Sequence, residues 1–235
     1  MKAVILAGGL GARLKPFTQI IPKPLLPVGE SSVLEIQILS LKKYGFNEIF
    51  IATNYMADYV QTYLGDGSKY NVKITFSKEE KPLGTCGPLS LLKDHLDEPF
   101  LLMNGDILTT MDFAKAYDFS LNIDADITVV TKEIITPFNF GEVVCENDYI
   151  VDVHEKPDFR NEILSGIYFL KPNLFEIIPS NTYYGMDMLI KEMLGRGMKV
   201  AKYLMHEYWI DIGQISDLQA AQDVYKNHFQ HIKKV

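Results

Sequence analysis

The chain has 235 residues, of which 47% are hydrophobic and 23% charged, with a formal net charge of −7. This length and composition suit one large α/β domain with its own core. The sequence contains no dense run of Lys and Arg, which argues against a nucleic acid as partner, because binding a phosphate backbone needs concentrated positive charge. A nucleotide substrate remains compatible, since it needs only a few local cations.

The two cysteines, Cys86 and Cys145, fit neither a metal-ligand spacing nor a disulfide framework. Cys86 has no His or Lys beside it, so we expect it to fill the core rather than act as a nucleophile. The first apolar run is too short for the core of a signal peptide. Every apolar stretch is also too short to span a bilayer. These features predict a cytoplasmic protein with no membrane partner.

The first half of the chain alternates strand and helix patterns. We expect strands at residues 2–7, 48–53, 71–76 and 99–103, and helices at 32–44, 58–63 and 89–96. The helix at 32–44 begins with the capping-box spacing of Ser32 and Glu35 and ends at Gly45. This alternation predicts a Rossmann-like α/β fold, with a mixed, mostly parallel sheet and helices on both faces.

The second half has fewer helices. We expect strands at 126–131, 141–145, 150–154, 163–170, 200–204 and 207–212, and helices at 187–194 and 216–229. The pattern predicts a mixed-sheet region that covers one end of the first half. No repeat or linker interrupts the chain, so we expect a single domain over residues 1–235. The basic tail is expected to be a solvated end (His228, His231, Lys233 and Lys234).

The glycine-rich segment after the first strand predicts a phosphate site. Gly8, Gly9 and Gly11 can bring backbone N–H groups close to a phosphate, because no Cβ obstructs the approach. Arg13 adds a planar set of donors suited to phosphate oxygens. Lys23 lies between two prolines, which stiffen the segment that presents its ammonium group. Together these residues favour a triphosphate-binding site.

Other interpretations of this segment are weaker. The Walker string G-x-x-x-x-G-K-[ST] does not occur in the sequence. The dinucleotide fingerprint G-x-G-x-x-G matches at Gly9 and Gly11, but Leu14 replaces its third glycine, which disfavours a dehydrogenase. A tight strand-to-helix turn that binds no ligand is the remaining alternative.

Residues 8–14 (GGLGARL) and 22–28 (PKPLLPV) resemble the nucleotide-binding signature of the sugar-1-phosphate nucleotidyltransferases, also called nucleotide-sugar pyrophosphorylases. The resemblance implies the nucleotide-diphospho-sugar transferase fold, with a nucleotide-binding half at about residues 1–130 and a sugar-binding half at about 131–235. It implies nucleotide contacts in the first segment (Leu6, Ala7, Gly8, Gly9, Gly11, Arg13 and Lys23). The hexapeptide repeats of a C-terminal left-handed β-helix are absent, so no second domain is expected.

Two carboxylates are candidate metal ligands. Asp106 follows Asn104 and Gly105 at the end of an apolar strand, where open α/β sheets bind ligands and where Mg²⁺ can meet substrate phosphates. Its alternative role is an Asx turn. Asp211, in the sequence WIDIG, could also belong to a helix N-terminal turn. The resemblance implies that both residues bind one Mg²⁺ and that Asn104 contacts the nucleotide. The implied catalytic set is Arg13, Lys23, Asp106 and Asp211.

Residues 79–85 (EEKPLGT) resemble the family's base-recognition loop. The register selects Glu79 for the nucleobase, with Pro82, Gly84 and Thr85 around base and ribose. The following sequence, Cys86-Gly87-Pro88, departs from the small residues that the family more often has there.

The resemblance also implies a sugar-phosphate site (Gly141, Glu155, Lys156, Gly166 and Asp211). Glu155 would accept hydrogen bonds from sugar hydroxyls, and Lys156 would neutralise the sugar phosphate. Without the resemblance, Glu155 and Lys156 would be interpreted as an exposed ion pair. Leu164 occupies a position where the family usually has Asn, which leaves the sugar open.

The resemblance implies transfer of a nucleoside monophosphate from an NTP to a sugar 1-phosphate with Mg²⁺, as a step in nucleotide-sugar supply for polysaccharide biosynthesis. The segment YLGDGSK (residues 63–69) favours the mannose-1-phosphate guanylyltransferase branch, hence GTP with a mannose- or heptose-type sugar 1-phosphate. Uridylyl-, thymidylyl- and cytidylyltransferases stay open, as do a phosphocholine-type cytidylyltransferase and a catalytically silent regulatory relative. The sequence leaves the oligomeric state open, including a homo-oligomer.

Overall fold

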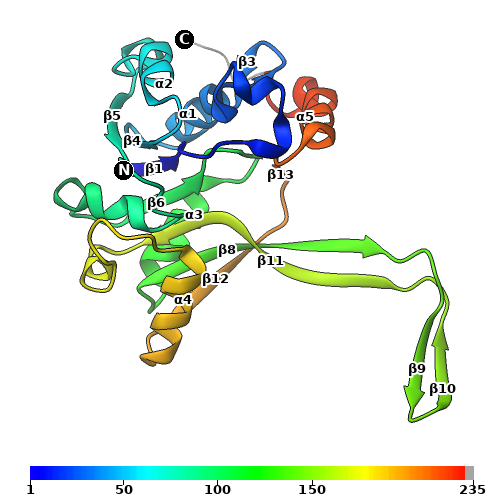
Figure 1. Cartoon of the computed structure of the whole chain (residues 1–235). Helices are drawn as coiled ribbons and strands as arrows, with labels where there is room; N and C mark the ends of the chain where they lie inside the picture. The colour runs from blue at the N-terminus through cyan, green and yellow to red at the C-terminus, as the bar shows by residue number, and fades with distance from the viewer. Residues whose placement is uncertain (231–235) are drawn as a thin grey trace.

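A computed structural model describes residues 1–230 of the chain. Its centre is a seven-stranded sheet (Figure 1) in the order β12 (Val200–Met205), β8 (Ile127–Pro137), β11 (Asp158–Leu170), β6 (Phe100–Asn104), β1 (Lys2–Leu6), β4 (Glu48–Thr53) and β5 (Lys73–Lys78). Strands β6, β1, β4 and β5 run parallel, and β12 runs parallel to β8. Strand β11 is antiparallel to both of its neighbours. The predicted mixed, mostly parallel sheet is confirmed.

Helices cover both faces of this sheet. Successive residues of a strand point to opposite faces, so Ala3 and Ile5 of β1 pack against one group of helices while Val4 faces the other. The first face carries α1 (Val33–Lys43), α2 (Ala57–Leu64) and α3 (Phe113–Asn122). The second carries α4 (Met186–Gly195) together with short 3₁₀ turns, and α5 (Ile215–His228) packs beside α1 over a third apolar cluster.

Short strands complete the architecture: β2 (Pro27–Val28) pairs with β3 (Ser31–Ser32), and β7 (Ile107–Thr109) with β13 (Trp209–Asp211). The sequence did not predict helix α3. Asp112 caps it by accepting a hydrogen bond from the Lys115 N–H at 2.9 Å.

Within the part of the chain that the structure describes, every helix is too short or too polar to cross a lipid bilayer.

The helix predicted at residues 89–96 is wrong. The chain forms two 3₁₀ turns there, Gly87–Leu91 and Lys93–His95. Ser90 explains part of the difference, because its Oγ donates to the Gly87 carbonyl at 2.7 Å and so competes with helical bonding. The apolar spacing that suggested a helix still serves the core, since Leu89, Leu92 and Leu96 are buried.

The capping box predicted at the start of α1 is confirmed. Glu35 N–H donates to Ser32 Oγ at 3.2 Å, and Ser32 N–H donates to Glu35 Oε2 at 3.0 Å. Glu35 is fully buried, and its carboxylate also accepts hydrogen bonds from the hydroxyls of Tyr63 and Tyr70, at 2.9 Å and 2.8 Å. The cap therefore ties α1 to the α2 region as well as closing the helix.

Replacing Ser32 by Ala should lower the free energy of unfolding by about 1 kcal/mol, the usual value of an N-cap side chain. Urea unfolding followed by circular dichroism measures the change. Ser180→Ala, at an exposed loop position, is the control and should leave the midpoint unchanged. Equal midpoints for the two variants would contradict the role of the cap.

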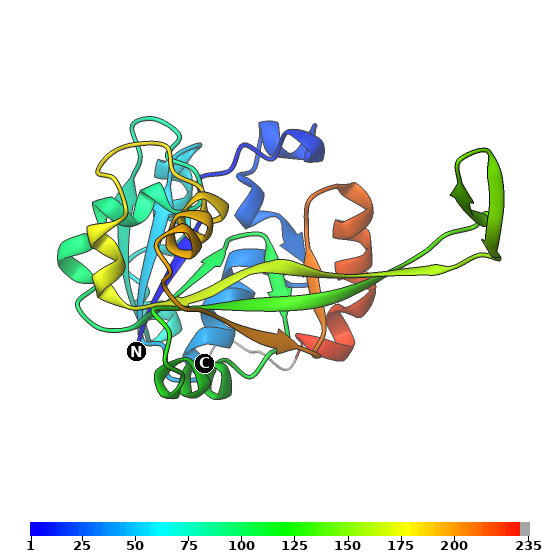
Figure 2. The same cartoon turned by 90° about the horizontal axis from the view of Figure 1, so that it is seen from below.

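The second half departs from expectation in one respect. Beyond the pairing of Lys132 with Met205, β8 and β11 continue as a two-stranded ribbon, and β9 (Glu142–Glu146) and β10 (Tyr149–His154) form a hairpin at its tip. Figures 1 and 2 show this ribbon leaving the body in both views. We call residues 133–163 the arm. The predicted strands exist, but those of the arm do not cover the first half, since they extend away from it.

The basic tail is also corrected in part. His228 belongs to α5, and its ring stacks on Tyr208 with centroids 4.7 Å apart, so it is not a free solvated end. His231, Lys233 and Lys234 lie outside the described residues.

Candidate active site

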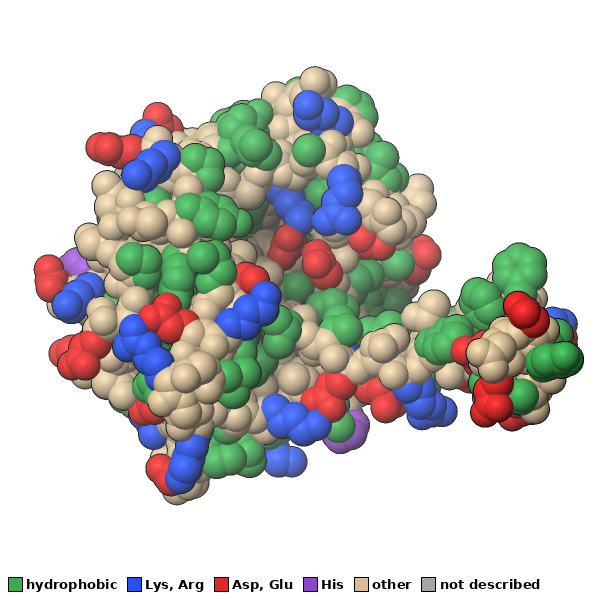
Figure 3. Space-filling view, turned by 60° about the horizontal axis from the view of Figure 1, so that its bottom comes forward, with side chains coloured by type: hydrophobic (Ala, Val, Ile, Leu, Met, Phe, Trp, Pro, Cys, Tyr) green, Lys and Arg blue, Asp and Glu red, His purple; other side chains and the backbone are tan. Residues whose placement is uncertain are grey.

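A cavity of about 280 Å³ lies at the carboxyl ends of β1, β4, β5 and β6. Open α/β sheets bind ligands at this edge, where the strand order reverses, because the connections there diverge and leave a crevice. Figure 3 shows a hollow in the body where basic and acidic side chains gather. The lining residues are Leu6, Gly8, Gly9, Asn54, Glu79, Pro82, Gly84, Thr85, Asn104, Asp106 and Tyr183. All but Asn54 and Tyr183 belong to the predicted nucleotide set.

The glycine loop is shaped by close contacts. Gly11 adopts the left-handed conformation (φ 59°), and a Cβ there would lie 2.7 Å from Thr18 Cγ2. Thr18 Oγ1 donates to the Gly11 carbonyl at 2.8 Å and fixes the turn. A Cβ on Gly9, by contrast, would meet nothing within 4 Å. The loop therefore keeps an open surface on which a phosphate can approach the backbone.

Strand pairing brings the two predicted metal ligands together. β13 pairs antiparallel with β7, placing Asp211 opposite Ile107, and the Ile212 N–H donates to the Asp106 carbonyl at 2.9 Å. The Lys23 ammonium forms an ion pair with the Asp106 carboxylate. Residues from the start, middle and end of the chain thus meet at this point.

Arg13 reaches the same cluster from the glycine loop. Its Nη2 lies 3.1 Å from the position that a Cβ on Gly213 would take. Because glycine has no side chain, the guanidinium has room at this turn. Asp217 Oδ2 accepts hydrogen bonds from the N–H groups of Gly213 and Gln214, at 3.1 Å and 2.9 Å, and shapes this turn. All four residues of the predicted catalytic set therefore lie together.

The electrostatics of the cluster favour a cation. Burial raises the pKa of Asp211, and the Asp106 charge raises it further, while Lys23 and Arg13 oppose the shift. Asp106 Oδ1 and Asp211 Oδ1 are buried, and neither has a hydrogen-bond partner among residues 1–230. Two such oxygens suit a hard divalent ion such as Mg²⁺.

The described residues contain no cluster of three or more acidic, His or Cys side chains that could hold a metal. An ion at Asp106 and Asp211 would therefore complete its shell with water and substrate phosphates, as Mg²⁺ usually does. The donor set fits the predicted metal site.

The loop after β5 forms the opposite wall of the cavity. Glu79 is buried, its Oε2 accepts from the Leu83 N–H at 2.9 Å, and burial raises the pKa of its carboxyl. Asn54 donates from Nδ2 to the Glu79 carbonyl at 3.3 Å. The Thr85 hydroxyl accepts from the Met186 N–H at 2.9 Å, which joins the loop to the first turn of α4. Glu79 thus organises the loop as well as facing the cavity.

Gln37 is a positioning residue that the sequence analysis missed. It lies buried on α1, and its Nε2 donates to the carbonyls of Asn104 and Ile107, at 2.9 Å and 2.7 Å. These bonds hold the turn that carries Asp106. A polar residue between the apolar Ile36 and Ile38 was the available signal.

Replacing Gln37 by Leu leaves the Asn104 and Ile107 carbonyls, one part-buried and one buried, without this donor. At about 1 kcal/mol for each lost hydrogen bond, the free energy of unfolding should fall by roughly 2 kcal/mol. Gln61→Leu, on the exposed face of α2, is the matched control. Urea unfolding measures both variants, and a Gln37→Leu protein as stable as the control would contradict the positioning role.

The predicted sugar-phosphate residues separate into two groups. Asp211 lies in the cluster, and Gly166 (φ 77°) lies against Asn104, whose Nδ2 would be 2.6 Å from a Cβ at residue 166. Gly141, Glu155 and Lys156 lie on the arm, exposed to solvent. Glu155 and Lys156 approach each other to 4.0 Å, as an exposed ion pair does. One chain alone does not assemble the predicted site, because the strands carrying these residues extend away from the body.

The segment at residues 63–69 does not line the cavity at the carboxyl ends of β1, β4, β5 and β6. Tyr63 and Lys69 instead line a separate groove with Asp58, Tyr59 and Thr62 on α2. The Lys69 ammonium lies 4.8 Å from the centroid of the Tyr63 ring. The geometry gives this segment a packing role, and the choice of nucleobase must be argued from other residues.

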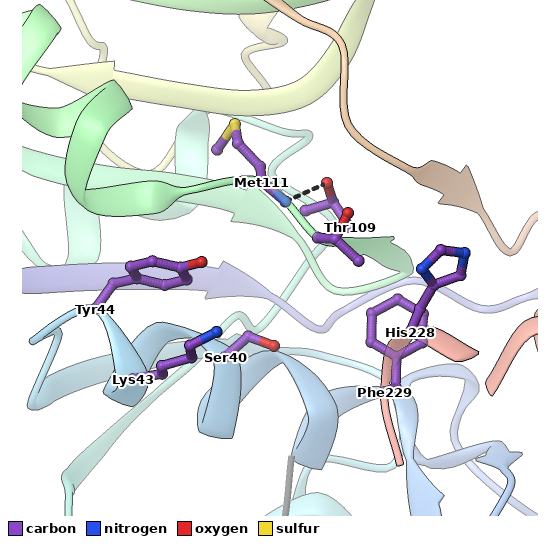
Figure 4. A pocket seen from close by; sticks show the side chains of 8 residues that line it. Ser40, Lys43, Tyr44, Thr109, Met111, His228 and Phe229 are labelled. Atoms are coloured by element: carbon purple, nitrogen blue, oxygen red, sulfur yellow. Dashed lines mark hydrogen bonds between the residues drawn. The ribbon is translucent and has the colours of Figure 1, made fainter. Parts of the chain in front are cut away.

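A smaller cavity, of about 70 Å³, lies between α1, the β7–α3 connection and the end of α5. Figure 4 shows its lining (Ser40, Lys43, Tyr44, Thr109, Met111, His228 and Phe229) and the Met111 N–H donating to Thr109 Oγ1 at 3.1 Å. None of the predicted site residues lines it. We regard it as a packing gap between elements.

A cavity of this kind, with cations and carboxylates at the carboxyl edge of a Rossmann-like sheet, is typical of proteins that act on nucleoside phosphates. The family model for nucleotidyl transferases matches residues 2–228, and the chain belongs to this family.

Several curated proteins are similar over nearly the whole chain. A probable mannose-1-phosphate guanylyltransferase 1 of Oryza sativa subsp. japonica is 34% identical, covering 92% of this chain and 62% of that protein. The mannose-1-phosphate guanylyltransferase catalytic subunit beta of Dictyostelium discoideum is 33% identical, covering 97% and 65%. A UTP–glucose-1-phosphate uridylyltransferase of Synechocystis sp. is 30% identical, covering 99% and 66%. The chain thus spans less than two thirds of the length of these relatives.

Solved structures share the fold. A putative glucose-1-phosphate thymidylyltransferase from Bacillus anthracis, in complex with a sucrose, superposes with a TM-score of 0.79 at 28% identity, covering 97% of this chain and 96% of that chain. HddC from Yersinia pseudotuberculosis complexed with GMP-PN superposes with a TM-score of 0.73 at 26% identity, covering 95% and 99%. These likenesses agree with the predicted nucleotide-diphospho-sugar transferase fold.

Proposed function

We propose that this chain transfers a nucleoside monophosphate from an NTP to a sugar 1-phosphate and releases pyrophosphate. The observation that carries the proposal is the convergence of Arg13, Lys23, Asp106 and Asp211 beside the cavity. Membership of the nucleotidyl transferase family supports it. We propose GTP and a mannose- or heptose-type sugar 1-phosphate as the preferred pair.

The site needs no general base. The attacking phosphate oxygen of the sugar 1-phosphate is already ionised at neutral pH, so the main obstacle is bringing two anions together. Catalysis then consists of positioning and charge neutralisation. Arg13 and the glycine-loop N–H groups would hold the leaving pyrophosphate. Lys23, which is paired with Asp106, would also bind the α-phosphate and would then interact less strongly with Asp106.

Asp106 and Asp211 would hold Mg²⁺, whose chemistry there is to neutralise phosphate charge. The buried Oδ1 atoms of both residues support this assignment. Burial raises the pKa of Asp211, Lys23 and Arg13 oppose that rise, and a bound divalent charge would oppose it further.

Glu79 supports guanine as the base. When ionised, a carboxylate accepts hydrogen bonds and donates none, and donors on a bound base would oppose the rise that burial causes in the pKa of Glu79. Guanine presents two neighbouring donors on its Watson–Crick edge, N1–H and the N2 amino group, which suit Oε1, the Glu79 oxygen that does not bond the Leu83 N–H. Cytosine, adenine, uracil and thymine each present a single N–H or amino group on that edge. The names of the guanylyltransferase relatives, and the GMP-PN bound to HddC, point the same way.

Other transferases remain as alternatives. Relatives named for uridylyl and thymidylyl transfer favour other bases, and a phosphocholine-type cytidylyltransferase would use the same nucleotide half. A cytoplasmic setting is also part of the proposal. It is supported by the two free thiols, Cys86 and Cys145, which suit a reducing compartment.

A substrate matrix tests the reaction and the preference. GTP, ATP, UTP, CTP and dTTP are each combined with mannose, glucose, galactose and heptose 1-phosphates and with phosphocholine, in the presence of Mg²⁺. Pyrophosphate release and mass spectrometry of the product should give the highest turnover with GTP. Turnover with phosphocholine alone would favour the non-sugar cytidylyltransferase. No release with any pair would favour a silent regulatory relative and overturn the proposal.

Lys23→Ala should lower turnover about 100-fold or more, because removing a charged contact at a phosphoryl centre costs several kcal/mol of transition-state stabilisation. Lys226→Ala, at an exposed position on α5, is the control for loss of one positive charge. Thermal unfolding should show that both variants fold. Near-normal turnover of Lys23→Ala would contradict the proposed mechanism.

A further inference from the structure

The arm exposes far more apolar surface than a solvated ribbon needs. All of β10 and nearly all of β9 are exposed, and Phe140, Tyr149 and Ile150 are 71%, 77% and 63% exposed. A two-stranded hairpin alone in water is marginally stable, and contiguous exposed apolar side chains usually mark an interaction surface. Figures 1, 2 and 3 all show the hairpin clear of the body of its own chain. Another surface should therefore cover it.

The turn between β10 and β11 (residues 155–157), which we call the corner of the arm, carries an unusual residue. Lys156 adopts the left-handed conformation (φ 48°), which is rare for a residue with a long side chain. It lies between β10 and β11, and its ammonium faces solvent beside Glu155. Such strain persists where the surroundings require it and often accompanies function. The corner thus presents an exposed cation and an exposed carboxylate near the tip of the arm.

Within residues 1–230, the cations that act on the Asp211 carboxylate are Arg13 and Lys23. Lys23 is already paired with Asp106. The same region holds the carboxylates of Asp211 and Glu79. Joining a triphosphate to a sugar phosphate gathers several negative charges, and each must meet a positive group for the reaction to proceed. A second anion beside this cavity would therefore be stabilised by a further cation.

We infer that two copies of this chain exchange arms, so that Glu155 and Lys156 of each protomer complete the sugar-phosphate site of the other. The inference rests on the proposed function. Exchange would be reciprocal about a two-fold axis, which closes the assembly at a dimer. The arm has the size of one side of a standard interface, about 20–30 residues.

A second copy also offers an apolar surface beside its cavity. Leu10, Phe17 and Ile20, on the glycine loop and the turn that follows, are 62%, 47% and 71% exposed. An arm crossing this rim would cover these side chains with its own. Its corner would then lie near the phosphates held by the glycine loop. A second copy would therefore cover the exposed arm and the exposed rim, and it would bring a further cation to the cavity.

Complementation tests the exchange. Lys23→Ala damages the cavity and Lys156→Ala damages the arm, so each variant alone should have low activity. The two are co-expressed with different tags, and mixed dimers are purified on both tags in turn. Each mixed dimer then has one intact cavity served by one intact arm, and should regain about half of the wild-type activity per dimer.

The outcomes separate the two proposals. If each arm served its own chain, both sites of a mixed dimer would be damaged and activity would stay at the level of the single variants. Failure to recover a mixed dimer on the second tag would also overturn the exchange. If the wild-type protein released no pyrophosphate with any substrate pair, the proposed function would fail, and the exchange would be decided by the experiment that follows.

Cys145 permits a test without activity. It is exposed on β9, whereas Cys86 is fully buried, so a benzophenone maleimide should react with the arm. Irradiation of the labelled native protein should give a product of twice the 26.7 kDa chain mass, cross-linked to residues 8–23 of the second copy. The Cys145→Ser protein should give none. A monomer in sedimentation velocity, or cross-links within one chain only, would overturn the exchange.

Discussion

The pairing of β13 with β7 is the contact on which the site depends. Without it, Asp211 would have no fixed place beside Asp106, and the turn that accommodates Arg13 would be unsupported. The pairing brings residues separated by about half the chain onto one edge of the sheet, where the glycine loop already lies. Local folding of the first half builds the cavity, but the pairing of the last strand brings Asp211 beside Asp106, Lys23 and Arg13. Family membership and fold agree with this arrangement.

Much of the cavity could be predicted because its residues follow strands directly. Gly8, Glu79 and Asp106 each come at or just after the carboxyl end of a parallel strand, so local patterns locate them. Gln37 and Tyr183 escaped prediction because their positions depend on how distant segments pack. The direction of the arm escaped for another reason: alternating apolar residues indicate a strand, whether or not the body covers it. The two 3₁₀ turns at Gly87–Leu91 and Lys93–His95 share the apolar spacing of a helix, and a side-chain hydrogen bond decided against one.

The arm also changes how the second half is understood. Strands β8, β11 and β12 belong to the same sheet as β1, β4, β5 and β6, so the body is continuous, while the residues predicted for the sugar-phosphate site are divided between body and arm. A division of this kind makes positional predictions from a single chain incomplete, because the missing group can come from another copy. Under the proposed exchange, the residues that the family resemblance implies would meet between two copies of the chain.

Glu79 has a consequence for attempts to alter specificity. One of its oxygens accepts from the Leu83 N–H, and the other lies 3.0 Å from the position that a Cβ on Gly8 would take, so this carboxylate bonds the loop after β5 and lies beside the glycine loop. Under the proposed function, base recognition and triphosphate binding would be linked through this one side chain. An exchange at residue 79 meant to change the accepted base would then also shift the loop proposed to hold the triphosphate. Changes in kcat and KM would then arise together, and only substitutions elsewhere in residues 80–85 could separate them.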